Sequence, residues 1–200
     1  MARTQAADYE ERKEVILDRA SALFARKGFL GTSVMDIAKA CGASKSLLYH
    51  YYPSKEDVLV GVMSSHVDVL LDDVAAVQGL QLSSEEGLNA LLHRFMQHYV
   101  GAADRQKVLL NELDNLPAKS RDQIVAKQRE IVEAVQALLV QAHPEALSDP
   151  ARARAKTMLV FGMINWTSNW LGPAGKLTPS QIADMAFEMA IIGSKADPKR

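Results

Sequence analysis

The sequence predicts an all-α fold, and three features of the chain agree on it. Apolar residues recur at spacings of three and four along nearly the whole chain, as they do on the buried face of an amphipathic helix. No long stretch alternates apolar and polar residues, as a half-buried strand would. Glycine, proline and serine fall between the periodic segments, where they start and stop helices. The 200 residues, 48% of them hydrophobic, are enough to bury a substantial core.

The first four helices are marked by residues that favour helix ends. A glycine follows the first apolar repeat, and serine or threonine precedes each of the next three. We therefore expect two short helices, the second over residues 45–52, and then a long connecting helix over residues 55–77. A proline breaks the chain before the connecting helix, and two acids occupy its first turn. The expected boundary residues are Gly28, Thr32 or Ser33, Gly42, Ser44, Pro53 and Ser54.

Five further helices follow the connecting helix. They are expected over residues 84–100, 104–116, 123–141, 151–171 and 179–192, which gives nine in all. We also expect a turn at residues 172–175 and a frayed tail from residue 194. The pattern divides into a three-helix domain, residues 8–53, and a larger helical domain, residues 54–195, which begins with the connecting helix.

The bulk composition disfavours several classes of protein. No apolar run approaches the roughly 18–20 residues that a membrane-spanning helix needs, and the first residues lack the apolar core of a signal peptide. The single cysteine, Cys41, cannot form an internal disulfide, so nothing requires an oxidising compartment. We expect a cytoplasmic protein without a membrane partner.

Positive charge is concentrated in one segment, although the formal net charge of the chain is −1. Residues 26–55 carry five basic side chains and one acidic one, whereas residues 8–18 are acidic. A confined basic patch is typical of a protein that binds the phosphate backbone of nucleic acid, and it is also common on solvated helical faces.

The second and third helices have the spacing of a helix-turn-helix. Gly42 supplies the backbone freedom for the turn, and Ala38, four residues earlier, lets the two helices cross closely. Ile37 and Leu48 then fall on the inward face of the pair. The outer face of the third helix carries Ser44, Lys45, Ser46, Tyr49 and His50, in position to enter a major groove. An ordinary corner between two helices has the same spacing.

The N-terminal quarter of the chain resembles the signature of the tetracycline-repressor (TetR) family. The resemblance rests on Ile16, Leu17, Ala20, Leu23, Phe24, Gly28, Phe29, Thr32, Ile37, Ala38, Gly42, Ala43, Ser44, Lys45, Leu48, Tyr49, His50, Tyr51, Tyr52, Ser54, Lys55, Glu56 and Leu59. Many spacings agree at once over about 45 residues. Membership would imply a bacterial one-component transcriptional regulator, with a helix-turn-helix joined to a helical domain that senses a small molecule and dimerises.

The resemblance implies which residues hold the backbone of double-stranded operator DNA. Thr32 or Ser33, at the start of the second helix, would contact a phosphate through a hydroxyl and the helix N-terminus. Tyr49 and Lys55 would each hold a further phosphate. His50 stands where another backbone or base contact is common.

Other residues are expected to read the base sequence. Lys45 and Ser46 are the candidates for contacts to base edges, since an ammonium group suits the acceptors of guanine. Leu47 stands where the family often has a small residue or threonine. Its side chain either packs inward or contacts a thymine methyl group, so the operator cannot be transferred from relatives.

Residues 108–117 and 161–170 of the larger domain resemble a TetR subgroup that often responds to acyl-CoA thioesters. Buried amides and carboxylates among aromatic side chains must find partners, either in the protein or in a ligand. The candidate effector-binding residues are Phe95, His98, Tyr99, Glu112, Phe161, Asn165, Trp166 and Asn169. For Trp166 and Trp170, the core of a dimer is the alternative location.

The family also implies a homodimer in which the eighth and ninth helices pair with those of a second copy. An apolar stripe on the last helix supports this, and it consists of Ile182, Met185, Ala186, Met189 and Ala190. We expect the effector-free dimer to repress from a near-palindromic operator. A small molecule between helices five to eight would release it by moving the fourth helix.

Two other classes of function fit less well. His93 and His98 are five residues apart, whereas two metal ligands on one helical face are three or four apart. The chain also lacks a glycine-rich phosphate loop and a nucleophile elbow. We therefore expect no catalytic residue, no cofactor and no metal. A helical scaffold that does not bind DNA would leave the polar outer face of the third helix unexplained.

Overall fold

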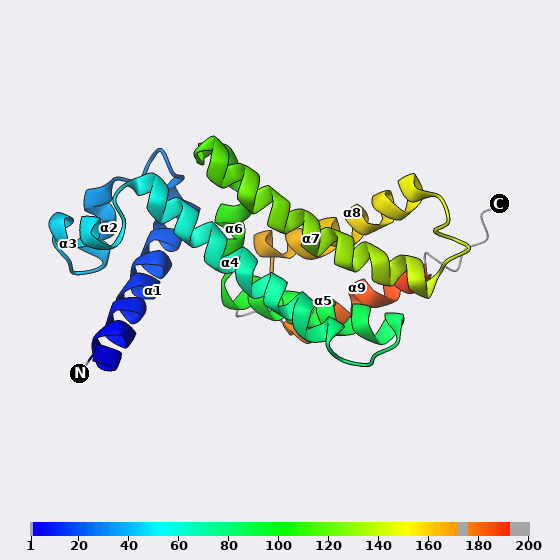
Figure 1. Cartoon of the computed structure of the whole chain (residues 1–200). Helices are drawn as coiled ribbons and strands as arrows, with labels where there is room; N and C mark the ends of the chain where they lie inside the picture. The colour runs from blue at the N-terminus through cyan, green and yellow to red at the C-terminus, as the bar shows by residue number, and fades with distance from the viewer. Residues whose placement is uncertain (1, 172–175, 193–200) are drawn as a thin grey trace. The chain divides into compact units, whose positions relative to one another are not determined.

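The computed structural model describes residues 2–171 and 176–192, with side chains from residue 8 onward. Within these residues the chain forms nine α-helices and two short 3-10 helices, and no strand, so the predicted all-α fold is confirmed (Figure 1). The α-helices are α1 (Ala2–Lys27), α2 (Val34–Ala40), α3 (Lys45–Tyr51), α4 (Lys55–Gln78), α5 (Ser84–Gly101), α6 (Ala103–Asn111), α7 (Ala118–Ala142), α8 (Pro150–Trp166) and α9 (Pro179–Ile192). The expected turn at 172–175 and the expected tail lie outside the described residues.

The helix ends in the N-terminal part form where the sequence predicts them. Gly28 and Gly42 have φ angles of 75° and 61°, a left-handed conformation that glycine adopts without a steric penalty. The hydroxyl oxygens of Ser33, Ser44 and Ser54 each accept a hydrogen bond from the backbone N–H three residues later. These serines therefore cap α2, α3 and α4.

Two predicted helices are shorter than expected. α6 stops at Asn111 and a 3-10 helix, Leu113–Asn115, follows. That 3-10 helix ends at Leu116, which is extended because Pro117 disfavours the helical conformation for the residue before it. α8 stops at Trp166 and tightens into the 3-10 helix Thr167–Asn169. There the hydroxyls of Thr167 and Ser168 donate to backbone carbonyls three residues earlier, which favours the tighter turn.

The chain separates into two compact units. The first consists of Met1–Val67 and Asp104–Val125, so it contains α1 to α3, the first half of α4, α6 and the start of α7. Its core is built from large apolar side chains with 1% exposure or less, among them Phe24, Ile37, Leu48, Leu59 and Met63. α6 adds Val108 and Leu109 to the buried set. The unit that contains the helix-turn-helix is therefore assembled from two separate stretches of sequence.

The second unit consists of Asp68–Ala103 and Ala126–Arg200. α5 is its central helix and packs along α9, and it buries Leu88, Leu92, Phe95 and Met96 completely. α8 and α9 also lie against each other in this unit. None of the described helices is both long and apolar enough to cross a membrane.

Candidate DNA-binding surface and effector region

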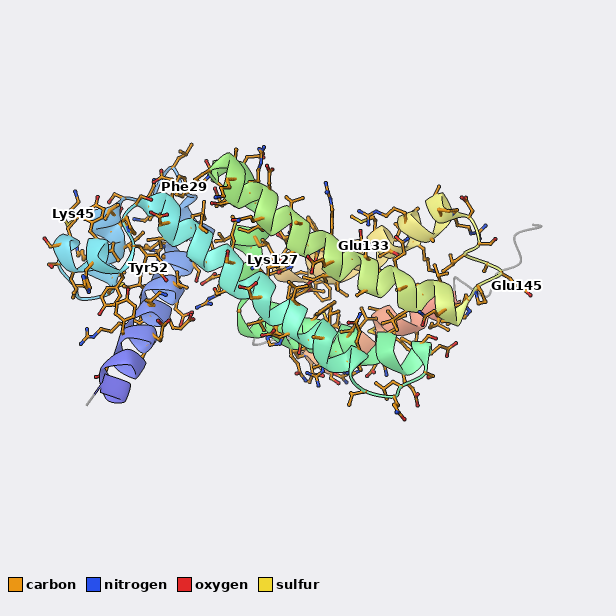
Figure 2. All side chains as sticks on the ribbon, in the orientation of Figure 1. Phe29, Lys45, Tyr52, Lys127, Glu133 and Glu145 are labelled. Carbon is orange, nitrogen blue, oxygen red and sulfur yellow. The ribbon has the colours of Figure 1, made fainter. Side chains whose placement is uncertain are left out.

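The outer face of α3 is free of contacts that would cover it. Ser44, Lys45, Ser46, Leu47, Tyr49 and His50 are all exposed, whereas Leu48 is only 1% exposed. Lys45 lies on the side of α3 that faces away from α4 (Figure 2), and its Nζ is 5.5 Å from the ring centroid of Tyr49. The predicted division of α3 into a buried and an outer face is thus present, and Leu47, 39% exposed, belongs to the outer face.

Aromatic contacts from α1 hold the end of α3. The ring centroids of Tyr9 and Tyr51 are 4.8 Å apart, and the Tyr9 ring meets His50 edge-on at 6.2 Å. These contacts hold the C-terminal end of α3 against α1, and His50 contributes to them from the exposed face. Tyr9 has no counterpart among the sequence-based candidates, because a single aromatic residue in an acidic, polar stretch gives no periodic signal.

Gly61 allows α4 to approach α1 and the end of α3. A Cβ atom at this position would lie 2.9 Å from Leu17 Cδ2 and 3.1 Å from Tyr52 Cε1, closer than side chains normally pack. Tyr52 is only 8% exposed. Burial, with a smaller contribution from the negative charge of Glu14, raises the pKa of the Tyr52 phenol to about 12.

Thr32 differs from the sequence-based expectation. It is fully buried, and its hydroxyl donates to the carbonyl oxygen of Gly28 at 2.9 Å. A phosphate contact would require that side chain to leave the core and break this bond. Ser33 is exposed at the first turn of α2, where its hydroxyl and backbone N–H both bond to the carboxylate of Asp36. Of the two, Ser33 has the exposure that a DNA contact needs.

Lys55 also has partners within the protein. Its Nζ donates to the carbonyl oxygens of Phe29 and Thr32 at 2.8 and 2.9 Å, and it lies 4.0 Å from the centroid of the Phe29 ring. Two carbonyl acceptors and a cation–π contact use most of what an ammonium group can offer. In this conformation Lys55 therefore fixes the loop between α1 and α2, and at most one of its protons remains for a phosphate.

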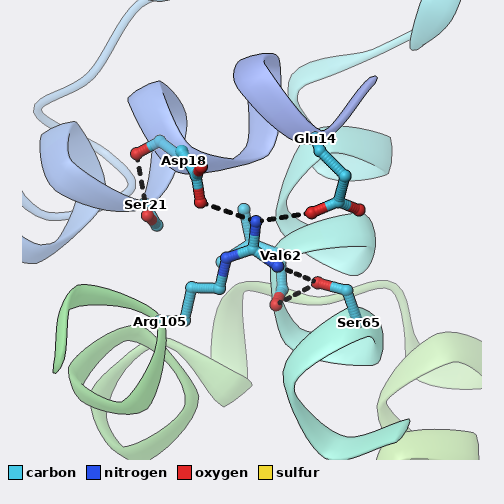
Figure 3. A network of polar contacts seen from close by, with 6 residues as sticks. All are labelled: Glu14, Asp18, Ser21, Val62, Ser65 and Arg105. Atoms are coloured by element: carbon cyan, nitrogen blue, oxygen red, sulfur yellow. Dashed lines mark hydrogen bonds and ion pairs between the residues drawn. The ribbon is translucent and has the colours of Figure 1, made fainter. Parts of the chain in front are cut away.

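A cluster around Arg105 joins α6 to α1 and α4 inside the first unit (Figure 3). The guanidinium donates to Glu14 Oε2 at 2.8 Å, to Asp18 Oδ1 at 2.7 Å and to Ser65 Oγ at 2.8 Å. Burial alone would lower the pKa of Arg105, but the hydrogen bonds to Glu14 and Asp18 outweigh it and raise the pKa. We name Arg105, Glu14, Asp18 and Ser65 the Arg105 cluster.

A second polar contact lies beside this cluster. His66 Nε2 of α4 is 2.7 Å from Gln106 Oε1 of α6, and the two residues are 3% and 1% exposed. Because buried polar groups are costly unless they are paired, this contact fixes the orientation of α6 on α4. Neither Arg105 nor Gln106 was a candidate from sequence.

Three of the effector-binding candidates form an aromatic cluster in the second unit. Phe95 and Tyr99 of α5 stack with ring centroids 6.3 Å apart, and Phe95 lies 6.3 Å from Phe161 of α8. Phe95 is fully buried, and the other two are at most 6% exposed. The structure therefore brings together three candidate aromatic side chains from α5 and α8, although Phe161 is at least 62 positions from the other two in the sequence.

The polar candidate on α5 is turned toward α4. His98 Nε2 lies 2.8 Å from Asp73 Oδ2, and Arg94 donates to Asp73 Oδ1 at 2.9 Å. Asp73 is only 7% exposed, so this carboxylate needs the positive or donor groups around it. His98 thus already has a partner in the protein.

The remaining candidates lie apart from the aromatic cluster. Glu112 belongs to the first unit, where it accepts a hydrogen bond from the Asn115 amide at 2.7 Å. Trp166 is 66% exposed, and Asn169 is exposed and donates to the Trp166 carbonyl oxygen. Asn165 is half-buried. The exposure of Trp166 and Asn169 in this protomer sets them apart from the buried aromatic side chains, and for Trp166 the core of a dimer remains the alternative location.

An apolar face extends over α8 and α9. It includes a groove of about 570 Å³, and Trp166 and Trp170 both contribute to its lining. We name this surface the α8–α9 face; it consists of Leu159, Met163, Trp166, Trp170, Met185 and Met189. Five large side chains here, those of Leu159, Trp166, Trp170, Met185 and Met189, are more than half exposed. So extensive an apolar surface is typical of a surface that a partner covers.

Comparison with known protein families covers both units. Residues 16–62 match the family model of bacterial regulatory proteins of the tetR family, and residues 81–193 match that of the tetracyclin repressor-like C-terminal domain. The second match alone spans more than half of the chain. The chain belongs to the TetR family.

Relatives of known structure support membership of the TetR family along the whole chain. A TetR-family transcriptional regulator from Bordetella parapertussis is 38% identical, with a TM-score of 0.85 over 90% of this chain and 93% of that one. AibR, solved in complex with isovaleryl coenzyme A and operator DNA, is 29% identical, with a TM-score of 0.78 over 89% of this chain and 97% of AibR.

Curated TetR-type relatives match over different lengths. The repressor KstR2 of Rhodococcus jostii is 24% identical over 91% of this chain and 90% of KstR2. The regulator YuxN of Bacillus subtilis is 42% identical over 59 residues, which are 30% of this chain and only 20% of YuxN. This higher identity is confined to a short match, whereas the weaker similarity to KstR2 extends along the chain.

Membership of the TetR family decides the class of function. The chain is a DNA-binding transcriptional regulator and not an enzyme, as its family and its helix-turn-helix indicate. Within the described residues, no group of three or more histidine, cysteine or carboxylate side chains is arranged to hold a metal ion.

Proposed function

We propose that this protein is a ligand-responsive repressor. A homodimer binds a near-palindromic operator with the outer faces of its two α3 helices, and a small molecule, an acyl-CoA thioester, releases it. The exposed face of α3 is the observation that supports DNA binding. Leu48 is buried beneath it, and the six exposed side chains are those of Ser44, Lys45, Ser46, Leu47, Tyr49 and His50. Because a transcriptional regulator must reach chromosomal DNA, we propose that the protein acts in the cytoplasm.

The proposed contacts divide into two kinds. Lys45 and Ser46 read base edges, and Leu47 contacts a thymine methyl group. The backbone is held by Ser33, Tyr49 and His50, with Ser44 at the N-terminus of α3. Thr32 and Lys55, as their hydrogen bonds indicate, contribute by fixing the loop between α1 and α2. Residues 8–53 thus carry the DNA contacts, and residues 54–195 serve effector binding and dimerisation.

Selection from a pool of random double-stranded DNA tests this assignment. We expect an inverted repeat whose half-sites are about one helical turn apart. Lys45→Ala should change the preferred bases, whereas Tyr49→Phe should weaken binding to all sequences alike. Lys107→Ala, which removes an exposed lysine of α6, serves as the matched control and should change neither. The assignment fails if the Lys45→Ala protein selects the same sequence with the same discrimination.

The effector proposal is supported by the aromatic cluster of Phe95, Tyr99 and Phe161 and by the relative AibR, which was solved with isovaleryl coenzyme A. Aromatic and aliphatic surface suits an acyl chain, and a few polar groups nearby would orient the thioester. The candidates for these contacts to the thioester are His98, Asn165, Trp166 and Asn169.

Acyl-CoA thioesters of increasing chain length provide the test. At least one should raise the melting temperature and weaken operator binding by about 5- to 150-fold, the range of a coupling of ~1–3 kcal/mol. Free coenzyme A is the control and should do neither. Phe161→Leu should reduce the response without abolishing DNA binding. If no chain length changes either quantity, the effector assignment fails while the DNA-binding proposal remains.

For the dimer, we propose that a second copy covers the α8–α9 face. Two tryptophans, three methionines and a leucine on this face form an apolar surface of the kind that an obligate interface buries. Trp166→Glu combined with Met189→Glu should yield monomers in sedimentation equilibrium. Leu80→Glu, at a residue with 52% exposure away from this face, is the control and should leave the dimer intact. A double variant that sediments as a dimer would contradict the proposal.

A further inference from the structure

Three basic side chains occupy the first two turns of α8 without an acidic partner. Arg152, Arg154 and Lys156 alternate with alanines there, and α8 has no acidic residue in its first turn. Within residues 2–171 and 176–192, no ion pair or hydrogen bond to these three side chains is present. The N-terminus of a helix already carries positive partial charge, so this arrangement costs stability in an isolated protomer.

Two of these three residues continue the stripe of the α8–α9 face. At 3.6 residues per turn, Arg152 and Lys156 fall on the same side of α8 as Leu159, Met163 and Trp166. Arg154 falls on the opposite flank. Burial, and to a smaller degree the charge of Arg152, lowers the pKa of Lys156. The two cations on the stripe are therefore close enough to repel each other.

α9 carries a complementary charge on its outer side. Glu188 is exposed beside Met185, Met189 and Ile192, and it has no ion pair within the part of the chain that the structure describes. Asp184, the other acid of α9, is 2.8 Å from His93 Nε2 on α5 and so is already engaged. By helical position, Glu188 neighbours Met185 and Ile192 on the exposed side of α9 and so borders the α8–α9 face. An unpaired acid on α9 thus accompanies two unpaired bases on α8.

We infer that Arg152 and Lys156 of one protomer pair with Glu188 of the partner subunit, and that these ion pairs align the two copies. The inference rests on the proposed dimerisation through the α8–α9 face. A twofold axis repeats each contact, so a surface with positive side chains on α8 and a negative side chain on α9 can be complementary to itself. The apolar residues supply the association, and the charges select the alignment and the identity of the partner.

This alignment also accounts for partner choice. Another protein of the same fold with an apolar α8–α9 face, but without these charges, would leave two cations and an acid unpaired at the interface. Self-association is then favoured over mixed dimers. The proposal thus assigns to Arg152, Lys156 and Glu188 a role in specificity that their positions on the outer side of the fold do not otherwise explain.

Charge reversal on the full-length protein tests the pairing. Glu188→Lys and Lys156→Glu should each raise the dimer dissociation constant about tenfold or more in sedimentation equilibrium, because like charges would then face each other. An equimolar mixture of the two variants should restore wild-type affinity as a heterodimer, since both symmetric pairs are then complementary. Native mass spectrometry with one variant isotopically labelled identifies that heterodimer, and its formation shows that both variants fold.

Arg154→Glu is the matched control, with the same change of charge on the same helix but on the opposite flank. The inference is overturned if both reversals leave the dimer as tight as wild type, if Arg154→Glu weakens it equally, or if the mixture forms no heterodimer. The Trp166→Glu, Met189→Glu double variant distinguishes a failure of the proposed interface from a failure of the ion pairing. If it also remains a dimer, the α8–α9 face itself is not the interface; if it dissociates while the charge reversals do not, only the ion pairing fails.

Discussion

Replacement of Arg105 by alanine should destabilise the protein by an amount that the structure allows us to work out. The guanidinium makes three hydrogen bonds of 2.7–2.8 Å, and its side chain is 12% exposed. Its acidic partners are well exposed, at 58% for Glu14 and 69% for Asp18, so water can replace the lost bonds. The polar part of the loss is then about 1–1.5 kcal/mol.

Loss of the aliphatic stem adds to this. Alanine removes two further methylene groups from a largely buried position, at about 0.8 kcal/mol for each one fully buried. Together the two contributions amount to about 2–3 kcal/mol in the free energy of unfolding. In a chain of this length that corresponds to a fall of roughly 5–10 °C in melting temperature. Arg105→Met keeps the stem and should lose only the polar part.

Urea unfolding of the full-length protein measures these differences. Arg121→Ala is the control, since Arg121 pairs at 4.0 Å with a fully exposed Asp114, and the change should stay within about 0.5 kcal/mol. In a Glu14→Gln, Asp18→Asn background, Arg105→Ala should cost about 1 kcal/mol less than in the wild type. The reasoning is refuted if Arg105→Met is as stable as wild type, because the hydrogen bonds would then contribute nothing.

Three other expectations concern the first unit. Lys55→Met should lower the melting temperature yet leave the salt dependence of operator affinity unchanged; a slope reduced by about two, one for each protomer of the dimer, would instead mean that Lys55 contacts a phosphate. The Tyr52 phenol, with a pKa of about 12 in the folded protein and about 10 when unfolded, should make the free energy of unfolding fall by about 2–3 kcal/mol as the pH rises from 10 to 12. Tyr52→Phe should lack that fall in urea titrations at high pH. Gly61→Ala should cost about 1–3 kcal/mol because its Cβ meets Leu17 and Tyr52, while Gly101→Ala, with open space around it, should cost nothing in the same assay.

Features governed by local rules were predictable from the sequence. Ser33, Ser44 and Ser54 cap helices because a side-chain oxygen reaches a backbone N–H three residues later, whatever lies elsewhere in the fold. The turn glycine and the buried Leu48 follow from spacing in the same way. The exposed face of α3 was predictable for the same reason, because it consists of the positions of this helix that are not buried.

Features that depend on partners distant in the sequence were not predictable from it. Thr32 and Lys55 occupy the positions that the family resemblance assigns to DNA contacts, but resemblance cannot tell which acceptors lie within reach of a side chain. Arg105 stands in a polar stretch, and its carboxylate partners are 87 and 91 positions away in sequence. In the second unit, three aromatic candidates do meet, whereas Trp166 lies on the exposed side of α8, which spacing alone does not distinguish from a side that lines a pocket.

The discontinuous make-up of the first unit matters for anyone who builds hybrid regulators. A junction placed after residue 53 or 67 would transplant Glu14 and Asp18 into a host that supplies some other residue in place of Arg105. The grafted part would then have two carboxylates without their guanidinium, and after a junction at residue 67 His66 would also lose its contact with Gln106. Residues 104–125 should therefore travel with residues 1–67 in any exchange of operator specificity. Recombination between related genes faces the same restriction, because a single crossover cannot move both stretches and leave the sequence between them behind.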